Sequence, residues 1–79
     1  MNWKWWRRKA AQVHADYGQA IAALGQVGFR VLREGDKHVV VSDGTRFLTI
    51  PRNNPVNAFT MGGIVRDAGL TVEQFRELL

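Results

Sequence analysis

The sequence predicts a small α+β domain with a three-stranded antiparallel sheet in the order α-β-β-β-α, followed by a short extra C-terminal helix. Three observations predict this class. A stripe of apolar residues at helical spacing lies near the start, apolar and β-branched runs flank Asp43-Gly44, and a helix-capping pattern begins at Thr71.

The first predicted element is a helix over about residues 4–25. Gly25 and Gly28 are expected to end it, because glycine is common just beyond a helix C-terminus. Its apolar stripe consists of Trp6, Ala10, Val13, Tyr17, Ala20, Ile21 and Leu24.

Three strands are predicted next, over residues 29–34, 38–42 and 45–50. Asp43-Gly44 indicates a two-residue hairpin turn, because both central positions of such a turn need a positive φ. Pro51 lacks the N–H for the next ladder hydrogen bond and is expected to close the third strand.

A two-residue turn fixes which residues face each other. It would pair Ser42 with Thr45, Val40 with Phe47 and His38 with Thr49. The face under the helices would then carry Val39, Val41, Leu48 and Ile50. His38 would lie on the opposite face, beside Val40 and Phe47.

The stretch after the third strand, RNNPVNAF, is predicted to be a loop. Thr60 is a candidate N-cap for a short helix that runs through Ala68 and stops at Gly69. Thr71 and Gln74 fit a capping box that starts the last helix.

Composition limits the classes of protein that fit. Seventy-nine residues correspond to one domain spanning positions 1–79, and the absence of cysteine excludes disulfides and thiolate zinc sites. No stretch approaches the roughly 20 apolar residues of a membrane span. Arg7-Arg8 is followed by polar residues instead of the apolar region of an export signal, so we expect a cytoplasmic protein.

The net charge of +4 comes from the N-terminal segment. Residues 1–16 form a basic, tryptophan-rich extension of the first predicted helix. Its cations and exposed rings are compatible with base stacking, an anionic membrane surface or a partner protein, or with a plain helix that places Trp6 in the core. The residues concerned are Trp3, Lys4, Trp5, Arg7, Arg8 and Lys9.

His38 is the main candidate for chemistry, although a histidine at a strand edge is most often an ordinary surface residue. Histidine titrates near neutral pH and can take or give a proton. Gly35 permits close backbone approach, and a local basic cluster could surround His38. A base beside cations suits RNA cleavage by internal attack of a 2′-hydroxyl, without a metal. The cluster consists of Arg33, Lys37, Arg46 and Arg52.

Other site types fit less well. His14 and His38 lie on different predicted elements without nearby paired carboxylates, so no metal site is expected. Ser42 lies four residues along a strand from His38, which is too far for a nucleophile–base hydrogen bond. No cofactor is expected.

Several short motifs in order resemble the HicA-type mRNA interferase toxins of bacterial toxin–antitoxin pairs. They are ALGQVGFRVLREGDKH, FLTIPRN and TMGGIVRDAGLTVEQF, and the resemblance covers residues 17–79. It implies a fold similar to a double-stranded-RNA-binding domain and a metal-independent endoribonuclease that cleaves mRNA. It further implies inhibition by a cognate HicB-like antitoxin protein.

The resemblance makes His38 the catalytic histidine. Beside it, we expect RNA contacts from Gly35, Lys37, Arg33, Arg46, Arg52 and Asn53. The chain departs from the family pattern at several positions: Asp36 stands where serine is common, Lys37 stands where some members have histidine, Asn53 replaces a histidine, and Phe59 replaces a glycine. A catalytically weak or inactive RNA- or partner-binding module of the same fold is therefore the alternative, and a peripheral membrane protein is a third.

Overall fold

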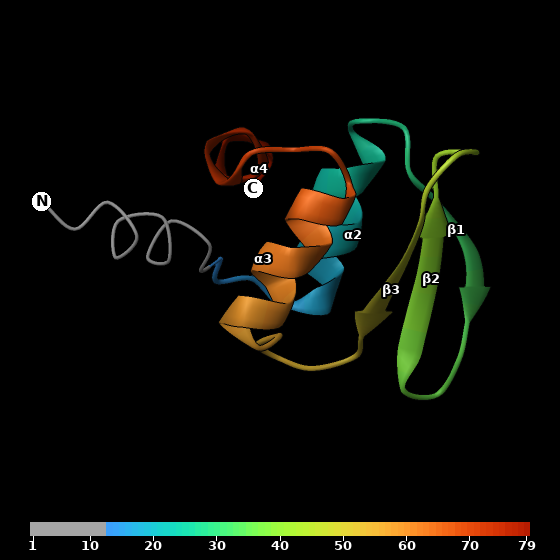
Figure 1. The fold of residues 1–79 in the computed structure, drawn as a ribbon. Coiled ribbons are helices and arrows are strands. Elements are labelled where there is room, and N and C mark those ends of the chain that lie inside the picture. The colour runs from blue at the N-terminus through green and yellow to red at the C-terminus, as the bar shows by residue number, and fades with distance from the viewer. Residues whose placement is uncertain (1–12) are drawn as a thin grey trace, which may run out of the picture.

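The structure is a computed structural model that describes residues 13–79 (Figure 1). A helix, a three-stranded antiparallel sheet and two further helices follow one another along the chain, which confirms the predicted α+β class and element order. The elements are α2 (Tyr17–Gly25), β1 (Arg30–Glu34), β2 (His38–Ser42), β3 (Phe47–Pro51), α3 (Ala58–Asp67) and α4 (Val72–Leu78). Figure 1 shows the helices gathered on one side of the sheet.

The first helix is shorter than predicted. Asp16 is its N-cap and forms a capping box with Gln19, so residues 13–16 are not helical and the predicted helix over residues 4–25 is wrong there. Residues 13–16 are the described end of the extension predicted over residues 1–16, and they are not helical; residues 1–12 lie outside the described part of the chain. Val13 is nevertheless fully buried, because residues 13–15 run beside the segment that enters α3.

The sheet has the strand order β1-β2-β3. β2 and β3 pair without interruption, from His38 opposite Pro51 to Ser42 opposite Phe47. The β1–β2 ladder contains an irregularity between Val31 and Arg33, where β1 has one residue more than its partner.

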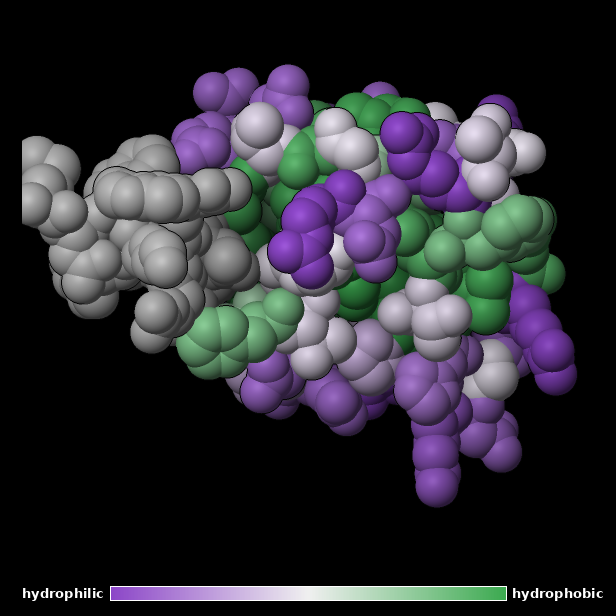
Figure 2. All heavy atoms as spheres, viewed as in Figure 1, coloured by the Kyte–Doolittle hydropathy of each residue, from purple (hydrophilic) through white to green (hydrophobic). Residues whose placement is uncertain are grey.

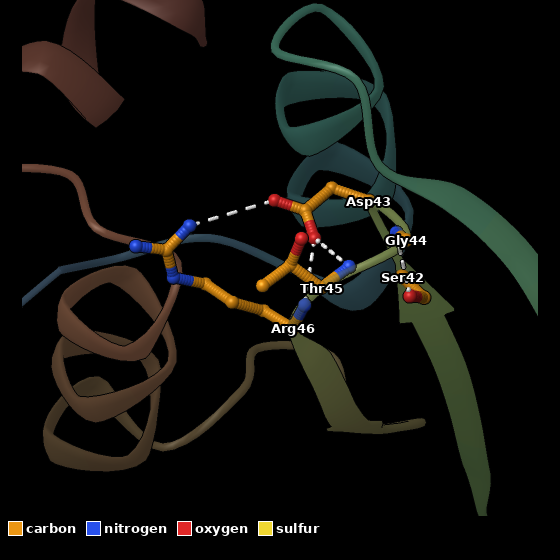
Figure 3. Close-up of polar contacts among 5 residues, drawn as sticks. All are labelled: Ser42, Asp43, Gly44, Thr45 and Arg46. Atoms are coloured by element: carbon orange, nitrogen blue, oxygen red, sulfur yellow. Dashed lines mark hydrogen bonds and ion pairs between the residues drawn. The ribbon is translucent and has the colours of Figure 1, made fainter.

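The turn between β2 and β3 is longer than predicted. It consists of residues 43–46, and the Asp43 side chain organises it (Figure 3). Asp43 Oδ1 accepts hydrogen bonds from the N–H of Arg46 at 2.7 Å and of Thr45 at 2.9 Å, and Gly44 has a φ of 97°. The predicted two-residue turn and its pairs are therefore wrong.

The lengthened turn moves the partner of Ser42 from Thr45 to Phe47, a shift of two residues. Because side chains alternate with a period of two along a strand, this shift leaves each side chain on its predicted face. The four residues predicted to lie under the helices are all buried: Val39, Val41, Leu48 and Ile50.

α3 begins earlier than predicted. Its N-cap is Asn57, whose Oδ1 accepts hydrogen bonds from the N–H groups of Phe59 at 3.0 Å and Thr60 at 3.1 Å. The predicted N-cap at Thr60 is wrong. The predicted capping box of the last helix is confirmed, with Thr71 and Gln74 bonded reciprocally.

One hydrophobic core joins the sheet to the helices. Its largest fully buried side chains come from every layer: Phe75, Leu24, Ile50, Met61, Val13, Val39, Val41, Val56 and Val65. The core leaves the opposite face of the sheet as the surface on which polar and charged strand residues lie.

Candidate functional site

The face of the sheet turned away from the core is called the open face below. Directly opposed residues of neighbouring strands share a face, so the pairing places its side chains in transverse rows. The first row is Arg30, Ser42 and Phe47; the second is Arg33, Val40 and Thr49; the third is His38 and Pro51. Figure 2 shows hydrophobic residues among charged side chains on one face of the molecule, including the region of the strands at the right.

An open concavity of about 460 Å³ lies at the end of the open face where β1 turns into β2. His38 lines it together with Arg33 and Lys37. The remaining lining residues are Gly35, Asp36, Val40 and Thr49. The concavity thus combines one imidazole, two cations and one carboxylate within reach of solvent.

Backbone hydrogen bonds hold the loop that carries these groups. The Gly35 N–H donates to the His38 carbonyl at 2.8 Å, and the Arg52 N–H donates to the Lys37 carbonyl at 2.8 Å. A Cβ atom at Gly35 would lie 3.3 Å from the His38 carbonyl oxygen, which is a tight contact. Glycine therefore allows the close approach that the sequence suggested, and it fixes the start of β2 where His38 lies.

The structure separates the other two arginines of the predicted basic cluster from His38. Arg46 lies in the β2–β3 turn, at the opposite end of β2, and its guanidinium is 3.6 Å from Asp43. The same guanidinium lies 3.1 Å from the place of a Cβ atom at Gly69, so it packs at the end of α3.

Arg52 points to the core side of the sheet. Its guanidinium lies 5.6 Å from the centre of the Tyr17 ring on α2 and 3.3 Å from Glu34. The Arg52 Nε atom is buried, and the structure shows no hydrogen-bond partner for it. Asn53, the next residue, is exposed, and its N–H donates to the Pro51 carbonyl at 2.9 Å.

Two open-face residues escaped the sequence analysis as binding candidates, Arg30 and Phe47. Arg30 and Arg33 are three residues apart, so regular alternation would put them on opposite faces. The extra residue in β1 puts both on the open face instead. Nothing in the sequence predicts that irregularity, so Arg30 could not have been assigned to the open face. Phe47 could have been named as a binding candidate, because the sequence already placed it on the face of His38.

The two histidines line different concavities. His14 borders one of about 350 Å³ with Asp16, Gln19 and Asn54. Within residues 13–79, no group of three or more histidine or carboxylate side chains is arranged to hold a metal ion. No helix in that part of the chain is long and apolar enough to cross a membrane. The residues expected to contact an anionic surface lie outside the described part of the chain. They are Trp3, Lys4, Trp5, Arg7, Arg8 and Lys9.

The chain matches no protein-family model, no curated protein and no solved structure.

Proposed function

We propose that this chain is a metal-independent endoribonuclease that cleaves mRNA, the toxin of a toxin–antitoxin pair, as its HicA-like motifs imply. The observation that supports the proposal is the position of His38. Its side chain borders a solvent-open concavity on an exposed sheet face, with Arg33 and Lys37 bordering the same concavity.

His38 is the general base in this mechanism. Its imidazole takes the proton of a ribose 2′-hydroxyl, and the freed oxygen attacks the neighbouring phosphorus. The bond from phosphorus to the 5′ oxygen breaks, that oxygen takes a proton from water, and a 2′,3′-cyclic phosphate remains. The hydroxide that is left takes the proton from the His38 imidazolium, which restores the base. Lys37 and Arg33 stabilise the negative charge that develops on the phosphoryl oxygens.

A non-catalytic RNA- or partner-binding module is the second candidate, and Asp36 favours it. Its carboxylate borders the same concavity, where it repels a phosphate, and Arg46 and Arg52 do not offset it because they lie elsewhere. This candidate keeps RNA binding through Arg33 and Lys37 and lacks cleavage.

Replacement of His38 separates the two candidates. We expect His38→Ala to fold normally and to lose RNA cleavage by at least about a hundredfold, the usual contribution of a general base. His14→Ala is the matched control, since His14 lines the other concavity. EDTA should leave the rate unchanged. Equal cleavage by His38→Ala and wild type would rule out the mechanism, and RNA binding without cleavage by wild type would establish the second candidate.

The partner implied by the resemblance is a HicB-like antitoxin protein. An acidic inhibitor that covers the concavity would meet Arg33 and Lys37 and would bury His38. Co-expression with the product of the adjacent gene, followed by size exclusion, tests for a complex. Diethyl pyrocarbonate should then modify His38 more slowly in the complex than in the free chain. Full reactivity of His38 in a stable complex would exclude inhibition by occlusion.

A further inference from the structure

Phe47 is the most exposed large hydrophobic side chain of the described residues, at 68% of its surface. It occupies the first position of β3, and its neighbours on the core side of that strand are almost fully buried. Aromatic side chains ordinarily contribute large buried areas to cores and interfaces. An aromatic ring standing free on a strand of the open face is therefore a candidate contact for a planar ligand.

Arg30 and Phe47 flank the same small residue. Both are in the row of Ser42, Arg30 from the β1 side and Phe47 from the β3 side. Adjacent strands are about 4.8 Å apart, so the Cα atoms of Arg30 and Phe47 are separated by about 10 Å. A single nucleotide can thus place its base on the Phe47 ring and its phosphate beside the Arg30 guanidinium.

The row of Phe47 lies on the same face as His38. The distance between them is short enough for one single-stranded RNA to contact both. Ser42 and His38 are four residues apart on β2, which corresponds to about 13 Å. Arg33 lies between the two rows, opposite Val40. Because stacked nucleotides rise by about 3.4 Å each, a base on Phe47 belongs to a nucleotide several positions away from the phosphate at His38.

We propose that the open face binds single-stranded RNA, with an unpaired base stacked on Phe47 and the phosphate of that nucleotide held by Arg30. The inference rests on the proposed function for the identity of the ligand and adds to it the class of RNA and a binding position distant from His38. Arg30 and Arg33 on the open face and Lys37 at the concavity complement the phosphates, and Asp36 at the concavity opposes them.

Stacking also determines which RNA binds. A base inside a duplex has both faces covered, so it cannot stack on Phe47, whereas every unpaired base has an accessible π-face. The open face should therefore prefer single strands to duplexes and should discriminate weakly among the four bases.

Binding is measured on the His38→Ala variant, so that cleavage does not consume the probe. The probe is a short single-stranded oligoribonucleotide containing 2-aminopurine, whose fluorescence falls when it stacks on an aromatic ring. We expect Phe47→Leu to weaken binding by about tenfold and to restore the probe's fluorescence, and Phe47→Trp to preserve both signals. Phe59→Leu is the matched control, since Phe59 is an exposed phenylalanine on α3.

The Arg30 contact is tested by salt dependence. Arg30→Gln should reduce the slope of log affinity against log salt by about 0.7, the value for one phosphate neutralised on a single strand. Arg66→Gln, an exposed arginine on α3, should leave the slope unchanged.

Three results would overturn the inference. They are equal affinities for Phe47→Leu and Phe59→Leu, tighter binding of a duplex of the same sequence, or an unchanged slope for Arg30→Gln. In each of these cases the proposed function stands as long as wild type cleaves RNA and His38→Ala does not. Absence of both RNA binding and cleavage in wild type would instead remove the proposed function, and this inference with it.

Discussion

The guanidinium of Arg52 lies 5.6 Å from the centre of the Tyr17 ring, on the side of the sheet that faces the core. Pro51, the last residue of β3, is opposite His38, and continued alternation turns the side chain that follows the strand away from the open face. Arg52 therefore joins the end of β3 to the start of α2, while Arg33 faces the concavity of His38.

This placement predicts that the two arginines have different roles. Arg52→Ala should lower the free energy of unfolding by about 1 kcal/mol, because it removes the contact with Tyr17, the ion pair with Glu34 and the packed aliphatic stem. Arg33→Ala should change it by less than about 0.5 kcal/mol, as for most surface substitutions.

Urea unfolding and RNA binding are measured on both variants. Arg33→Ala should weaken RNA binding and Arg52→Ala should not, once the fraction folded is equal. Equal losses of RNA affinity in the two variants would show that Arg52 also reaches the RNA.

The N-terminus of α3 provides a second prediction. Asn57→Ala should destabilise the protein by about 1 kcal/mol, because it leaves the N–H groups of Phe59 and Thr60 without their side-chain acceptor. Thr60→Ala, inside the first turn, should cost less than about 0.5 kcal/mol. Thermal unfolding of the two variants compares them directly. A larger loss for Thr60→Ala would mean that the helix begins where the sequence alone suggested.

The face on which each residue of β2 and β3 lies could be predicted from the sequence, because side chains alternate with a period of two and only an odd error in register would reverse them. Val39 and Ile50 were assigned to the core correctly although the turn length was wrong, since an error of two residues preserves the face. The turn length itself depends on a side-chain acceptor, Asp43, that competes with the two-residue turn suggested by Asp43-Gly44.

The N-termini of α2 and α3 differ in how well the sequence predicts them. Asp16 and Gln19 have the spacing of a capping box, so the start of α2 was visible and the longer apolar stripe obscured it. Asn57 and Thr60 both suit an N-cap, and local pattern does not choose between them.

The candidate-site residues that are near one another in the sequence were the best predicted. Gly35, Lys37 and His38 belong to one short loop and strand start, so local geometry keeps them together. Arg46 and Arg52 were grouped with them by charge alone, and their actual positions depend on tertiary contacts with Gly69 and Tyr17.

Two glycines of the C-terminal half should respond in opposite ways to replacement by alanine. Gly63 is inside α3, and a Cβ atom there would have no other atom within 4 Å. Gly63→Ala should therefore raise the free energy of unfolding by about 0.5–1 kcal/mol, since alanine is the better helix former.

Gly69→Ala should have the opposite effect to Gly63→Ala. The φ of Gly69 is 82°, and a Cβ atom would lie 3.1 Å from the Arg46 guanidinium, so Gly69→Ala should lower stability by at least about 1 kcal/mol. Chemical denaturation measures both changes. Stabilisation by Gly69→Ala would contradict the left-handed conformation that ends α3.

The last prediction concerns acid stability. Hydrogen bonds from the backbone N–H groups of Arg46 and Thr45, together with the nearby Arg46 guanidinium, hold the pKa of Asp43 below its ordinary value of 3.8. A carboxyl group whose pKa is lower in the folded state stabilises the fold at pH values above its unfolded pKa. That stabilisation is lost as the pH falls through the folded pKa.

Asp43→Ala should therefore melt at a lower temperature than wild type at pH 7, and the difference should shrink as the pH is lowered from about 4 further into acid. Asp43→Asn keeps an acceptor oxygen for the two N–H groups but lacks the charge, so its loss of melting temperature at pH 7 should be smaller.

Asp36→Ala is the control, because Asp36 is an exposed aspartate outside this turn. Melting temperatures across the acid range test the prediction. A difference between wild type and Asp43→Ala that stayed constant down to the most acidic pH would show that Asp43 acts through its shape and not through its ionised carboxylate.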